Sequence, residues 1–392
     1  MGEWKSFQVG EIGKVITGKT PKTSISDNYG GYIPFLTPSD DMSVKYVRKT
    51  AKTLTEKGLS EVKNAILPAN SVCVSCIGSD LGKVVITTRP TVTNQQINSI
   101  VVDEARFDIS FVYYAMRILG KKLNFISKTS TAVPIVNKSS FSSYEIECPS
   151  LKEQKQIAAV LSVLDAKIEC NRMINDNLYE MVNAYYTSLF KDVECEMTTI
   201  GNYAERIHSG GTPTTSNAAY WDGTFGWFSS GETRNRFVIS TEKSITQTGI
   251  DNSSTKLASK HDIVMASAGQ GFTRGQTSML LIDTYVNQSV IVIHADRNIL
   301  PYLFWNLANR YEELRAISDS SSIRGSLTTK MIAAFEIPRA NNDVIQTFSG
   351  FAWAVIPQIE NNLLENERLA ALRDSLLPKL MSGEIDVSDV QL

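Results

Sequence analysis

The sequence predicts an α+β protein in which two similar mixed α/β globular domains are separated by two long helices, packed as an antiparallel coiled coil with a pseudo-twofold axis. Three observations lead to this prediction: a coiled-coil pattern after residue 150, a second copy of it 191 residues later, and matched landmarks before each copy. The expected segments are a first domain, a central helical spacer, a second domain and a C-terminal helical spacer, at 1–150, 151–197, 198–340 and 341–392.

The first long helix is predicted from apolar or Asn residues that recur at alternating steps of four and three. This period of 3.5 residues is typical of a coiled-coil seam rather than of the broader apolar face of a surface helix. Ser150 and Glu153 form a capping-box pattern at its start. The predicted seam residues of this helix are Ile157, Leu161, Leu164, Ile168, Asn171, Asn175, Leu178 and Val182.

The second long helix repeats this pattern, with Asn at the same two places. Buried seam Asn residues lower stability but specify register and partner, so the matched pairs indicate that the two helices pack on each other; two unrelated amphipathic helices are the alternative. Because only about seven residues join the first helix to the second domain, the pair is expected to be antiparallel. Pro357 predicts a kink or a later start. The predicted seam residues here are Ile359, Asn362, Asn366, Leu369 and Leu376.

The segments before the two helices share a series of landmarks. Ile12-Gly13 recurs as Ile200-Gly201, a Gly-x-Thr-Pro turn occurs at 18–21 and at 210–213, and Asn94-Gln95 recurs as Asn287-Gln288. Alternating or apolar runs predict strands, and longer apolar patterns predict helices. The expected strands are 71–77, 96–102, 263–266 and 289–293, and the expected helices are 109–119 and 300–315.

The composition is that of an ordinary globular protein without a membrane span or a signal peptide. The 392 residues include 42% hydrophobic and 20% charged residues, and the five cysteines favour a reducing cytoplasm over a disulfide framework. The first domain carries 18 Lys and Arg against 13 Asp and Glu, whereas the two helical spacers carry 5 against 8 and 3 against 8. A polyanion is therefore expected to bind the globular domains, and the acidic helices to face other partners.

Sequence motifs for catalysis are weak. Residues 13–20 match the phosphate-binding loop pattern, but a turn-rich segment follows where that loop needs a helix, and the second copy lacks the Lys. A nucleotide-binding enzyme that uses Lys19 is kept as a remote alternative. The three His are scattered, and the Cys-x-x-Cys at 73–76 has no partner pair, so no metal site is expected. No catalytic triad or methyltransferase motif occurs. We therefore expect no catalytic residues and no bound cofactor in this chain.

The remaining candidate function is nucleic-acid recognition by polar and basic loops of the two domains. Lys and Arg neutralise phosphates, whereas Arg, Asn, Ser and Thr can also bond base edges. The loops around Lys22, Arg234 and Arg274 are the strongest candidates, because turn-rich segments direct polar side chains outward. The predicted DNA-binding residues are Lys19, Lys22, Thr23, Ser24, Tyr29, Tyr32, Lys83, Lys128, Thr214, Thr215, Ser216, Trp221, Trp227, Arg234, Asn235, Arg236, Arg274 and Arg324.

Three further features of the sequence are Ile12-Gly13 with the Gly-x-Thr-Pro turn, Leu-Lys-Glu-Gln-Lys-Gln-Ile-Ala at 151–158, and the segment 372–385 that ends the second helix. In these features the chain resembles, over essentially its whole length, the specificity (S) subunits of type I restriction–modification systems. The last of these is quite specific to the family, whereas the turn alone is weak.

The resemblance implies two target-recognition domains that each read one half of a bipartite, asymmetric site in double-stranded DNA. It further implies that the helices set the gap between the halves and dock two methyltransferase (M) subunits, and that restriction (R) subunits join for cleavage. S-adenosylmethionine, ATP and Mg would then bind to those partner subunits. An S-like subunit of a methylation-only system and a protein-binding scaffold without a DNA role are the alternatives.

Overall fold

The chain folds as two units whose strands follow one another in the same order. The computed structural model describes residues 4–129, 135–190, 196–269, 273–320 and 325–390. Unit 1 comprises residues 1–170 and 366–392, and unit 2 comprises 171–365, so both long helices contribute to each unit. Among the described residues, no helix is long and apolar enough to cross a membrane.

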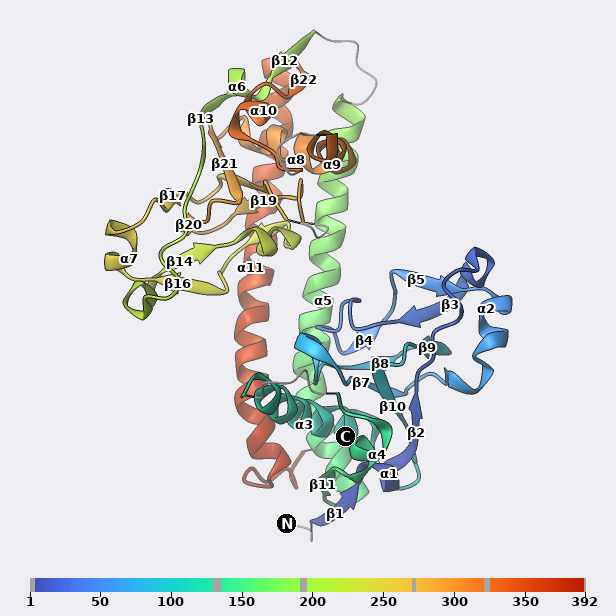
Figure 1. The fold of residues 1–392 in the computed structure, drawn as a ribbon. Coiled ribbons are helices and arrows are strands. Elements are labelled where there is room, and N and C mark those ends of the chain that lie inside the picture. The colour runs from blue at the N-terminus through green and yellow to red at the C-terminus, as the bar shows by residue number, and fades with distance from the viewer. Residues whose placement is uncertain (1–3, 130–134, 191–195, 270–272, 321–324, 391–392) are drawn as a thin grey trace. The chain divides into compact units, whose positions relative to one another are not determined.

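Unit 1 is built on a five-stranded sheet and a four-stranded sheet (Figure 1). The five-stranded sheet consists, in spatial order, of β2 (Gly13–Thr17), β10 (Ile97–Val102), β7 (Val72–Ser75), β8 (Val84–Thr87) and β4 (Tyr46–Val47). The four-stranded sheet consists of β5 (Lys52–Leu54), β3 (Tyr29–Leu36), β9 (Thr91–Thr93) and β6 (Ile66–Leu67). The other elements are β1 (Lys5–Gln8), which pairs with β11 (Glu145–Cys148), and the helices α1 (Val9–Ile12), α2 (Glu56–Glu61), α3 (Ile109–Thr129) and α4 (Lys138–Ser143).

Unit 2 repeats this topology strand for strand. Its five-stranded sheet consists of β13 (Ala204–Ser209), β21 (Val290–Ala295), β18 (Ile263–Ala266), β19 (Thr277–Leu280) and β15 (Phe237–Val238). Its four-stranded sheet consists of β16 (Lys243–Ile245), β14 (Trp221–Phe228), β20 (Thr284–Val286) and β17 (Lys256–Ala258). The remaining elements are β12 (Met197–Thr199), paired with β22 (Glu336–Pro338), and the helices α6 (Ile200–Tyr203), α7 (Gln247–Asp251), α8 (Leu300–Asn309), α9 (Tyr311–Ser320) and α10 (Thr329–Ala333).

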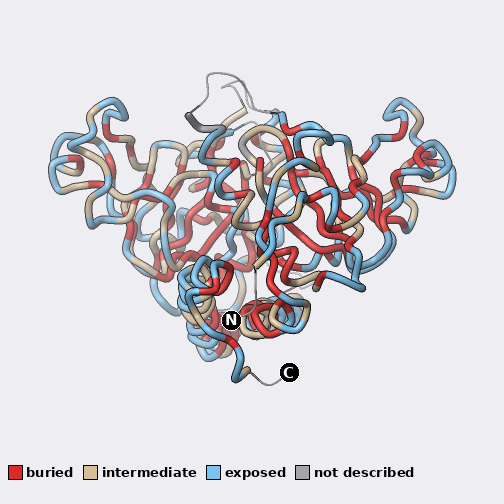
Figure 2. The backbone as a smooth tube through the Cα atoms, turned by 90° about the horizontal axis from the view of Figure 1, so that it is seen from below, coloured by how far each residue is buried: buried red, intermediate tan, exposed pale blue. Residues whose placement is uncertain are grey.

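The central strand of each five-stranded sheet is buried on both faces. Figure 2 shows buried backbone running through the interior of the globular parts and exposed loops at their edges. In β7, Val72 and Val74 belong to the apolar cluster beneath the helices, whereas Cys73 belongs to the cluster between the two sheets. This position explains why the strand expected at 71–77 contains a run of buried residues instead of alternating buried and exposed ones. Each unit is therefore a layer of helices, a large sheet and a small sheet.

The two long helices, α5 (Leu151–Phe190) and α11 (Asn342–Met381), are 40 residues each, and α11 starts 191 residues after α5. The predicted cap is confirmed, because the Glu153 amide donates to Ser150 Oγ at 3.4 Å. The later start predicted from Pro357 is wrong, since α11 begins at Asn342 and continues through the proline. Pro357 is exposed, which places the missing backbone hydrogen bond on the solvent side of the helix.

The helix predicted at 109–119 is confirmed and runs on to Thr129, but the helix predicted at 300–315 is wrong as a single element. It is divided into α8 and α9 at Arg310, whose backbone leaves the helical region. The Arg310 guanidinium donates to the Glu336 carbonyl at 2.6 Å and pairs with Glu313 at 2.6 Å. These contacts to another segment accompany the break, which no residue with a low helix propensity signals in the sequence.

Within each unit the α5 and α11 segments run antiparallel. In unit 1, Asp165 of α5 pairs with Arg373 of α11, and Gln156, nearer the start of α5, donates to the carbonyl of Val390 in the segment that follows α11. In unit 2, Asn362 donates to Asn175 Oδ1 at 2.7 Å and Tyr185 packs on Phe351. All thirteen predicted seam residues are buried or partly buried, and none is exposed.

The position where the globular part of unit 1 meets the long helices is ionic, and we call Lys45, Tyr114, Asp165 and Arg373 its helix junction. The buried Asp165 accepts from Tyr114 Oη at 2.5 Å and from Arg373 at 2.7 Å. Lys45, which is 8% exposed, donates to Ser162 at 2.8 Å and to Tyr114 at 3.3 Å. Burial lowers the pKa of Lys45 to about 8, and the negative charge of Asp165 partly opposes this shift.

The equivalent position in unit 2 is apolar and aromatic. By the element order and the offset between the helices, Arg236, Trp305, Ile356 and Val182 occupy the places of Lys45, Tyr114, Asp165 and Arg373; we call them the helix junction of unit 2. Trp305, Ile356 and Val182 are at most 1% exposed and belong to one apolar cluster. Trp305 also stacks on Tyr179 with ring centroids 5.7 Å apart. At equivalent positions, the same fold therefore contains an ion pair in unit 1 and apolar and aromatic packing in unit 2.

Candidate nucleic-acid interface

The loop that follows β2 in unit 1 is held beneath β9 by the Gly-x-Thr-Pro turn. A Cβ on Gly18 would lie 2.2 Å from the Asn94 carbonyl oxygen, so only glycine fits. The Lys19 amide donates to the Thr93 carbonyl at 2.8 Å, and Thr20 Oγ1 donates to Gln95 Oε1 at 2.6 Å. Two landmarks that recur in the sequence therefore contact each other, and together they set the position of the loop.

A buried asparagine and an acidic side chain hold the rest of this loop. Asn28 donates to the Lys22 carbonyl and to Glu61 Oε1, both at 3.1 Å, and Glu61 Oε2 accepts from the Lys22 amide at 2.9 Å. This backbone hydrogen bond is the main cause of the lowered pKa of Glu61. The side chains of Lys22, Thr23 and Ser24 are exposed, as is Lys19.

Aromatic residues support the loop from β3. Tyr29 is half-buried and donates to the Pro21 carbonyl at 2.9 Å, and burial raises the pKa of its hydroxyl. Its ring packs edge-on against Phe35 at 6.2 Å. Tyr32 is 67% exposed and donates to Glu56. Tyr29 thus positions the loop, whereas the Tyr32 ring is available to a ligand.

Unit 2 builds the same loop with different aromatic residues. A Cβ on Gly210 would lie 1.9 Å from the Val286 carbonyl oxygen, and Thr212 donates to Gln288, as Thr20 does to Gln95. Trp221 Nε1 donates to the Thr214 carbonyl at 3.2 Å, and its ring packs edge-on against Trp227 at 5.0 Å. The side chains of Thr214, Thr215 and Ser216 are exposed.

Comparison of the two loops separates shared residues from different ones. Thr23-Ser24 and Thr215-Ser216 are identical and equally exposed, whereas Lys22 stands where unit 2 has Thr214. Identical residues on the same scaffold suit contacts that do not depend on base sequence, such as those to phosphate oxygens.

The loops that follow the longest strand of each four-stranded sheet differ most. Residues 37–45 of unit 1 contain an exposed carboxylate, Asp41, which accepts from the amide and hydroxyl of Ser43 at 2.9 and 2.6 Å. Residues 229–236 of unit 2 instead expose three predicted site residues, which are Arg234, Asn235 and Arg236. Sequence reasoning did not include Asp41 and Ser43, although an alignment of the two copies shows that this loop changes in both charge and length.

The exposed arginines of unit 2 already have protein partners. Arg234 pairs with Glu242. The Arg236 guanidinium lies 4.3 Å from the Tyr179 ring centroid and 3.4 Å from Asp176. Both ion pairs are solvent-exposed and therefore weak, so a DNA phosphate or base can replace the carboxylate.

Some predicted site residues do not lie on the free surface. Trp227 is 5% exposed, and its Nε1 donates to the Gly211 carbonyl at 3.3 Å. Arg274 is 8% exposed, donates to the Gly325 carbonyl at 2.6 Å and pairs with Asp319, contrary to the expected outward direction. Arg324 and the side chain of Lys128 lie outside the described residues.

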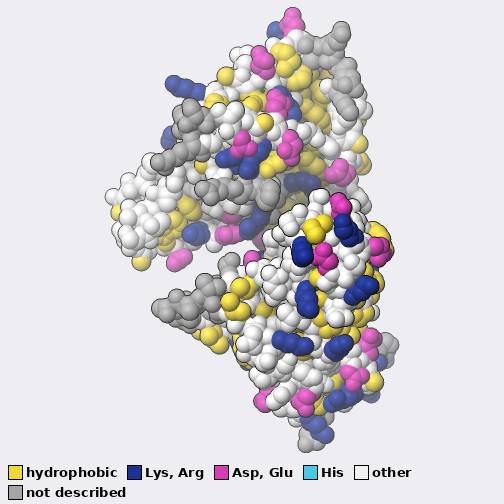
Figure 3. All heavy atoms as spheres, turned by 45° about the vertical axis from the view of Figure 1, so that its right-hand side comes forward, with side chains coloured by type: hydrophobic (Ala, Val, Ile, Leu, Met, Phe, Trp, Pro, Cys, Tyr) yellow, Lys and Arg dark blue, Asp and Glu magenta, His cyan; other side chains and the backbone are white. Residues whose placement is uncertain are grey.

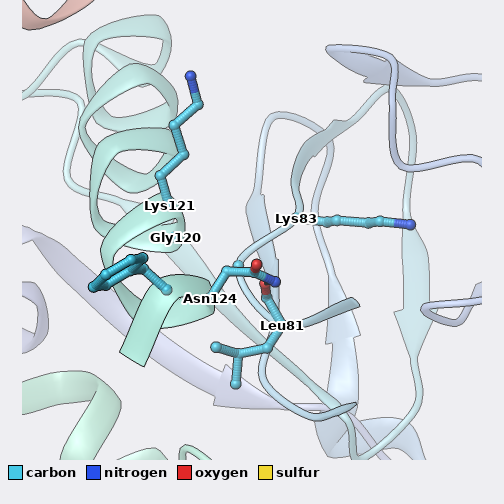
Figure 4. Close-up of a pocket in the computed structure, with 7 residues that line it drawn as sticks. Leu81, Lys83, Gly120, Lys121 and Asn124 are labelled. Carbon is cyan, nitrogen blue, oxygen red and sulfur yellow. Dashed lines mark hydrogen bonds between the residues drawn. The ribbon is translucent and has the colours of Figure 1, made fainter. Parts of the chain in front are cut away.

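Lys83 lies beside a shallow pocket of about 290 Å³ where the loop at residues 81–83 packs on α3. Lys83 pairs with Asp80 at 2.6 Å and Lys121 with Asp374 at 3.2 Å, and Figure 4 shows the two lysines pointing away from each other. They do not converge on one anion. The pocket is lined by Leu81, Gly82, Lys83, Gly120, Lys121, Asn124 and Phe125.

The two segments that contain most of the candidate DNA-binding residues differ in charge. Residues 19–94 contain ten Lys and Arg and six Asp and Glu, whereas the equivalent residues 211–287 contain six of each. Figure 3 shows the basic side chains of unit 1 spread singly over the globular part that faces the viewer, with fewer acidic ones between them. Phosphate attraction is therefore expected to come mainly from unit 1.

The structure does not favour a nucleotide site at Lys19. Residues Gly13–Thr17 form strand β2, and the next helical element is only a short 3-10 turn at Ser26–Asn28. A phosphate-binding loop needs the glycine-rich segment between a strand and a helix N-terminus. In the part of the chain that the structure describes, no group of three or more His, Cys, Asp or Glu could hold a metal ion.

Comparison with known proteins gives a consistent result. The family model described as the type I restriction modification DNA specificity domain matches residues 1–180 and 193–340. The chain is 23% identical over 413 aligned residues to the type I restriction enzyme MjaIX specificity subunit of Methanocaldococcus jannaschii, covering 99% of this chain and 95% of that one. It is 33% identical over 178 residues to the HindI specificity subunit of Haemophilus influenzae, covering 43% of this chain and 38% of that one.

The fold is similar to that of a solved relative. The S subunit of a type I restriction–modification system from M. genitalium aligns with a TM-score of 0.54 at 16% identity, over 97% of this chain and 96% of that one. At this identity the likeness concerns the fold alone.

Proposed function

Because this chain belongs to the family of type I restriction–modification DNA specificity proteins, we propose that each of its two globular parts reads one half of a bipartite, asymmetric site in double-stranded DNA. The observation that carries this proposal is that one scaffold, present twice, holds an identical exposed Thr-Ser loop and also a loop that differs in charge between the copies, 37–45 in one and 229–236 in the other. Two copies of a fold with different reading loops suit two different half-sites.

The side chains of these loops suit two kinds of contact, to phosphates and to base edges. Thr23, Ser24 and their counterparts Thr215 and Ser216 would bond phosphates in both half-sites, and Lys19 and Lys22 would add charge in the first. Base edges would be read by the loops that differ. Arg234 can donate to guanine and Asn235 can pair with adenine, whereas the Asp41 carboxylate can accept from cytosine.

We propose that the chain supplies specificity and leaves catalysis to partner subunits. The exposed apolar residues of α5 support a protein partner on the long helices: Val163 is 68%, Met173 50% and Met181 45% exposed. Two methyltransferase subunits would dock there and bring S-adenosylmethionine, and restriction subunits would bring ATP and Mg. The methylation-only alternative differs only in lacking the restriction subunits.

The test is a methylation map. The chain is expressed with a type I methyltransferase subunit in a bacterium that lacks DNA methylation, and the genome is sequenced for N6-methyladenine. We expect one gapped motif whose halves differ. A stable complex of the two proteins that leaves no motif would contradict the proposal and favour the scaffold alternative.

A further inference from the structure

The hydrogen bond between the seam asparagines Asn175 and Asn362 does not distinguish the two long helices. Asn171 and Asn175 of α5 stand at the same helix positions as Asn362 and Asn366 of α11, given the 191-residue offset. The hydrogen bond from Asn362 to Asn175 could form equally well between α5 helices of two copies of the chain, because both Asn positions occur on α5 itself. This hydrogen bond sets the register without selecting the partner. The bond from Asn171 to Glu365 at 2.7 Å adds some preference for α11, because α5 has Ile174 at the position of Glu365.

The helix junctions do differ between the two helices. Asp165 of α5 corresponds to Ile356 of α11, and Arg373 of α11 corresponds to Val182 of α5. In the folded chain, Arg373 Nη1 lies 2.7 Å from Asp165 Oδ1 in unit 1, whereas Ile356 and Val182 belong to one apolar cluster in unit 2. The Asp165 and Arg373 side chains are 7% and 13% exposed, so neither can recover its hydration in place.

We propose that the buried Asp165–Arg373 pair makes α5 select α11 and reject the α5 of a second copy. Two α5 helices in the same antiparallel register would place Asp165 against Val182 at both junctions. Two α11 helices would place Arg373 against Ile356. The first mismatch leaves the buried Asp165 carboxylate without its ion-pair partner, and such a group is strongly destabilising, whereas the matched pair is close to neutral. In the second mismatch Arg373 loses Asp165 but keeps Asp374 of its own helix at 2.9 Å, so the penalty there is smaller.

The surroundings of the carboxylate strengthen this selection. Tyr114 donates to Asp165, and Asp374 beside Arg373 accepts from Arg117 and Lys121 of α3, both at 3.2 Å. A second α5 would also leave these α3 cations without Asp374, because α5 has Asn183 at that position. In unit 2 the same fold packs Ile356 and Val182 at this position without charges. The stability of the fold alone therefore does not explain why unit 1 has an ion pair there.

The consequence rests on the proposed function. A chain whose helices pair only with each other presents two different recognition surfaces, and hence reads an asymmetric site. Pairing of like helices from two copies would instead present two equal surfaces and read a palindromic site.

The test uses the full chain, folded and then cut at a protease site inserted within residues 191–195. Two preparations, one carrying a heavy isotope label, are mixed and kept in enough urea for the fragments to exchange, and native mass spectrometry then counts the pairs. Exchange of the label between heterodimers shows that partners were sampled. For the natural sequence we expect heterodimers to exceed either homodimer by at least about 100-fold.

The decisive variant is Asp165→Ile with Arg373→Val, which gives unit 1 the residues of unit 2. We expect the homodimer fraction to rise at least tenfold, although the segment after α11, which packs on unit 1 through Val387, keeps some preference for the native pair. Val182→Ile with Ile356→Val is the matched control at the other junction and is expected to change nothing. Arg373→Lys keeps the charge and should keep the preference.

Two results would overturn the proposal: homodimers from the natural sequence at the level of the double variant, or a double variant that exchanges label yet stays as heterodimeric as the natural protein. Neither readout involves DNA, so the proposed function can fail or hold independently.

Discussion

Units 1 and 2 share their topology but differ at the helix junction, where unit 1 has Asp165 and Arg373 and unit 2 has Ile356 and Val182. The side chains of both pairs are at most 13% exposed, so the fold requires burial at these positions and not a particular chemistry. A buried ion pair is no more stabilising on average than apolar residues of similar size, but it penalises a wrong partner severely. The comparison therefore indicates that the ionic residues of unit 1 determine which helices pair with each other.

The reading loops show the same contrast on the surface. The Gly-x-Thr-Pro turn and the Asn-Gln pair hold equivalent loops in both units, whereas the loops at 37–45 and 229–236 differ in charge and length. The shared contacts belong to the scaffold, and the residues that differ are the ones available for specificity.

The largest expected effect breaks the ionic junction. Arg373→Met leaves the buried Asp165 carboxylate without its counterion and should lower the free energy of unfolding by about 3–5 kcal/mol in a denaturant titration. Adding Asp165→Ile should restore most of that loss, because the carboxylate without a counterion is then removed. Equal losses in the single and double variants would contradict the comparison.

The second prediction concerns how the free energy of unfolding depends on pH through Lys45, which belongs to unit 1. The pKa of Lys45 is about 8 in the folded chain and 10.5 in the unfolded chain, so the unfolded chain binds more protons between these values and stability should rise with pH there. The contribution is about 3 kcal/mol. The Lys45→Met variant should lack this rise, so the difference between the stability curves of the natural protein and the variant should increase from pH 8 to 10.5. A difference curve that is flat between pH 8 and 10.5 would argue against it.

The third prediction concerns the basic surface of unit 1. Lys19→Ala with Lys22→Ala should reduce the slope of log affinity against log salt by about 2, which is roughly 15-fold in affinity across a fourfold change in salt. Thr214→Ala with Ser216→Ala in unit 2 is the control that should leave this slope unchanged. The measurement is DNA binding by the complex at several salt concentrations, and equal slopes for all three proteins would mean that these lysines do not contact phosphate.

The smallest effect is expected at Arg236, which is exposed where Lys45 is buried. Arg236→Ala removes a contact with Tyr179 and an ion pair with Asp176, whose side chain is 74% exposed. The loss of unfolding free energy should be about 1 kcal/mol or less. A loss as large as that of Arg373→Met would show that the two junctions are not different in kind.

The long helices could be predicted from sequence because their evidence is periodic and repeated. The seam residues, the Ser150 cap and the antiparallel direction all follow from local spacing and chain connectivity. The break at Arg310 and the continuous helix through Pro357 could not be predicted, since the first accompanies contacts with Glu336 and Glu313, and the second depends on which side of the helix faces solvent.

The candidate site was predictable only in part, for a similar reason. Exposed Thr and Ser residues in turn-rich loops were identified correctly as exposed, whereas Arg274 and Trp227 are buried by partners distant in sequence. Asp165 and Arg373 are 208 residues apart. Nothing in their local sequence indicates that they meet.

The central claim is that each unit reads its own half-site, and the most direct test is the methylation map of the Arg234→Ala, Asn235→Ala variant. We predict a motif that changes in one half only, with the other half and the gap unchanged. The matched unit 1 variant, Asp41→Ala with Ser43→Ala, should change the opposite half. A variant that alters both halves together, or neither, would contradict the account.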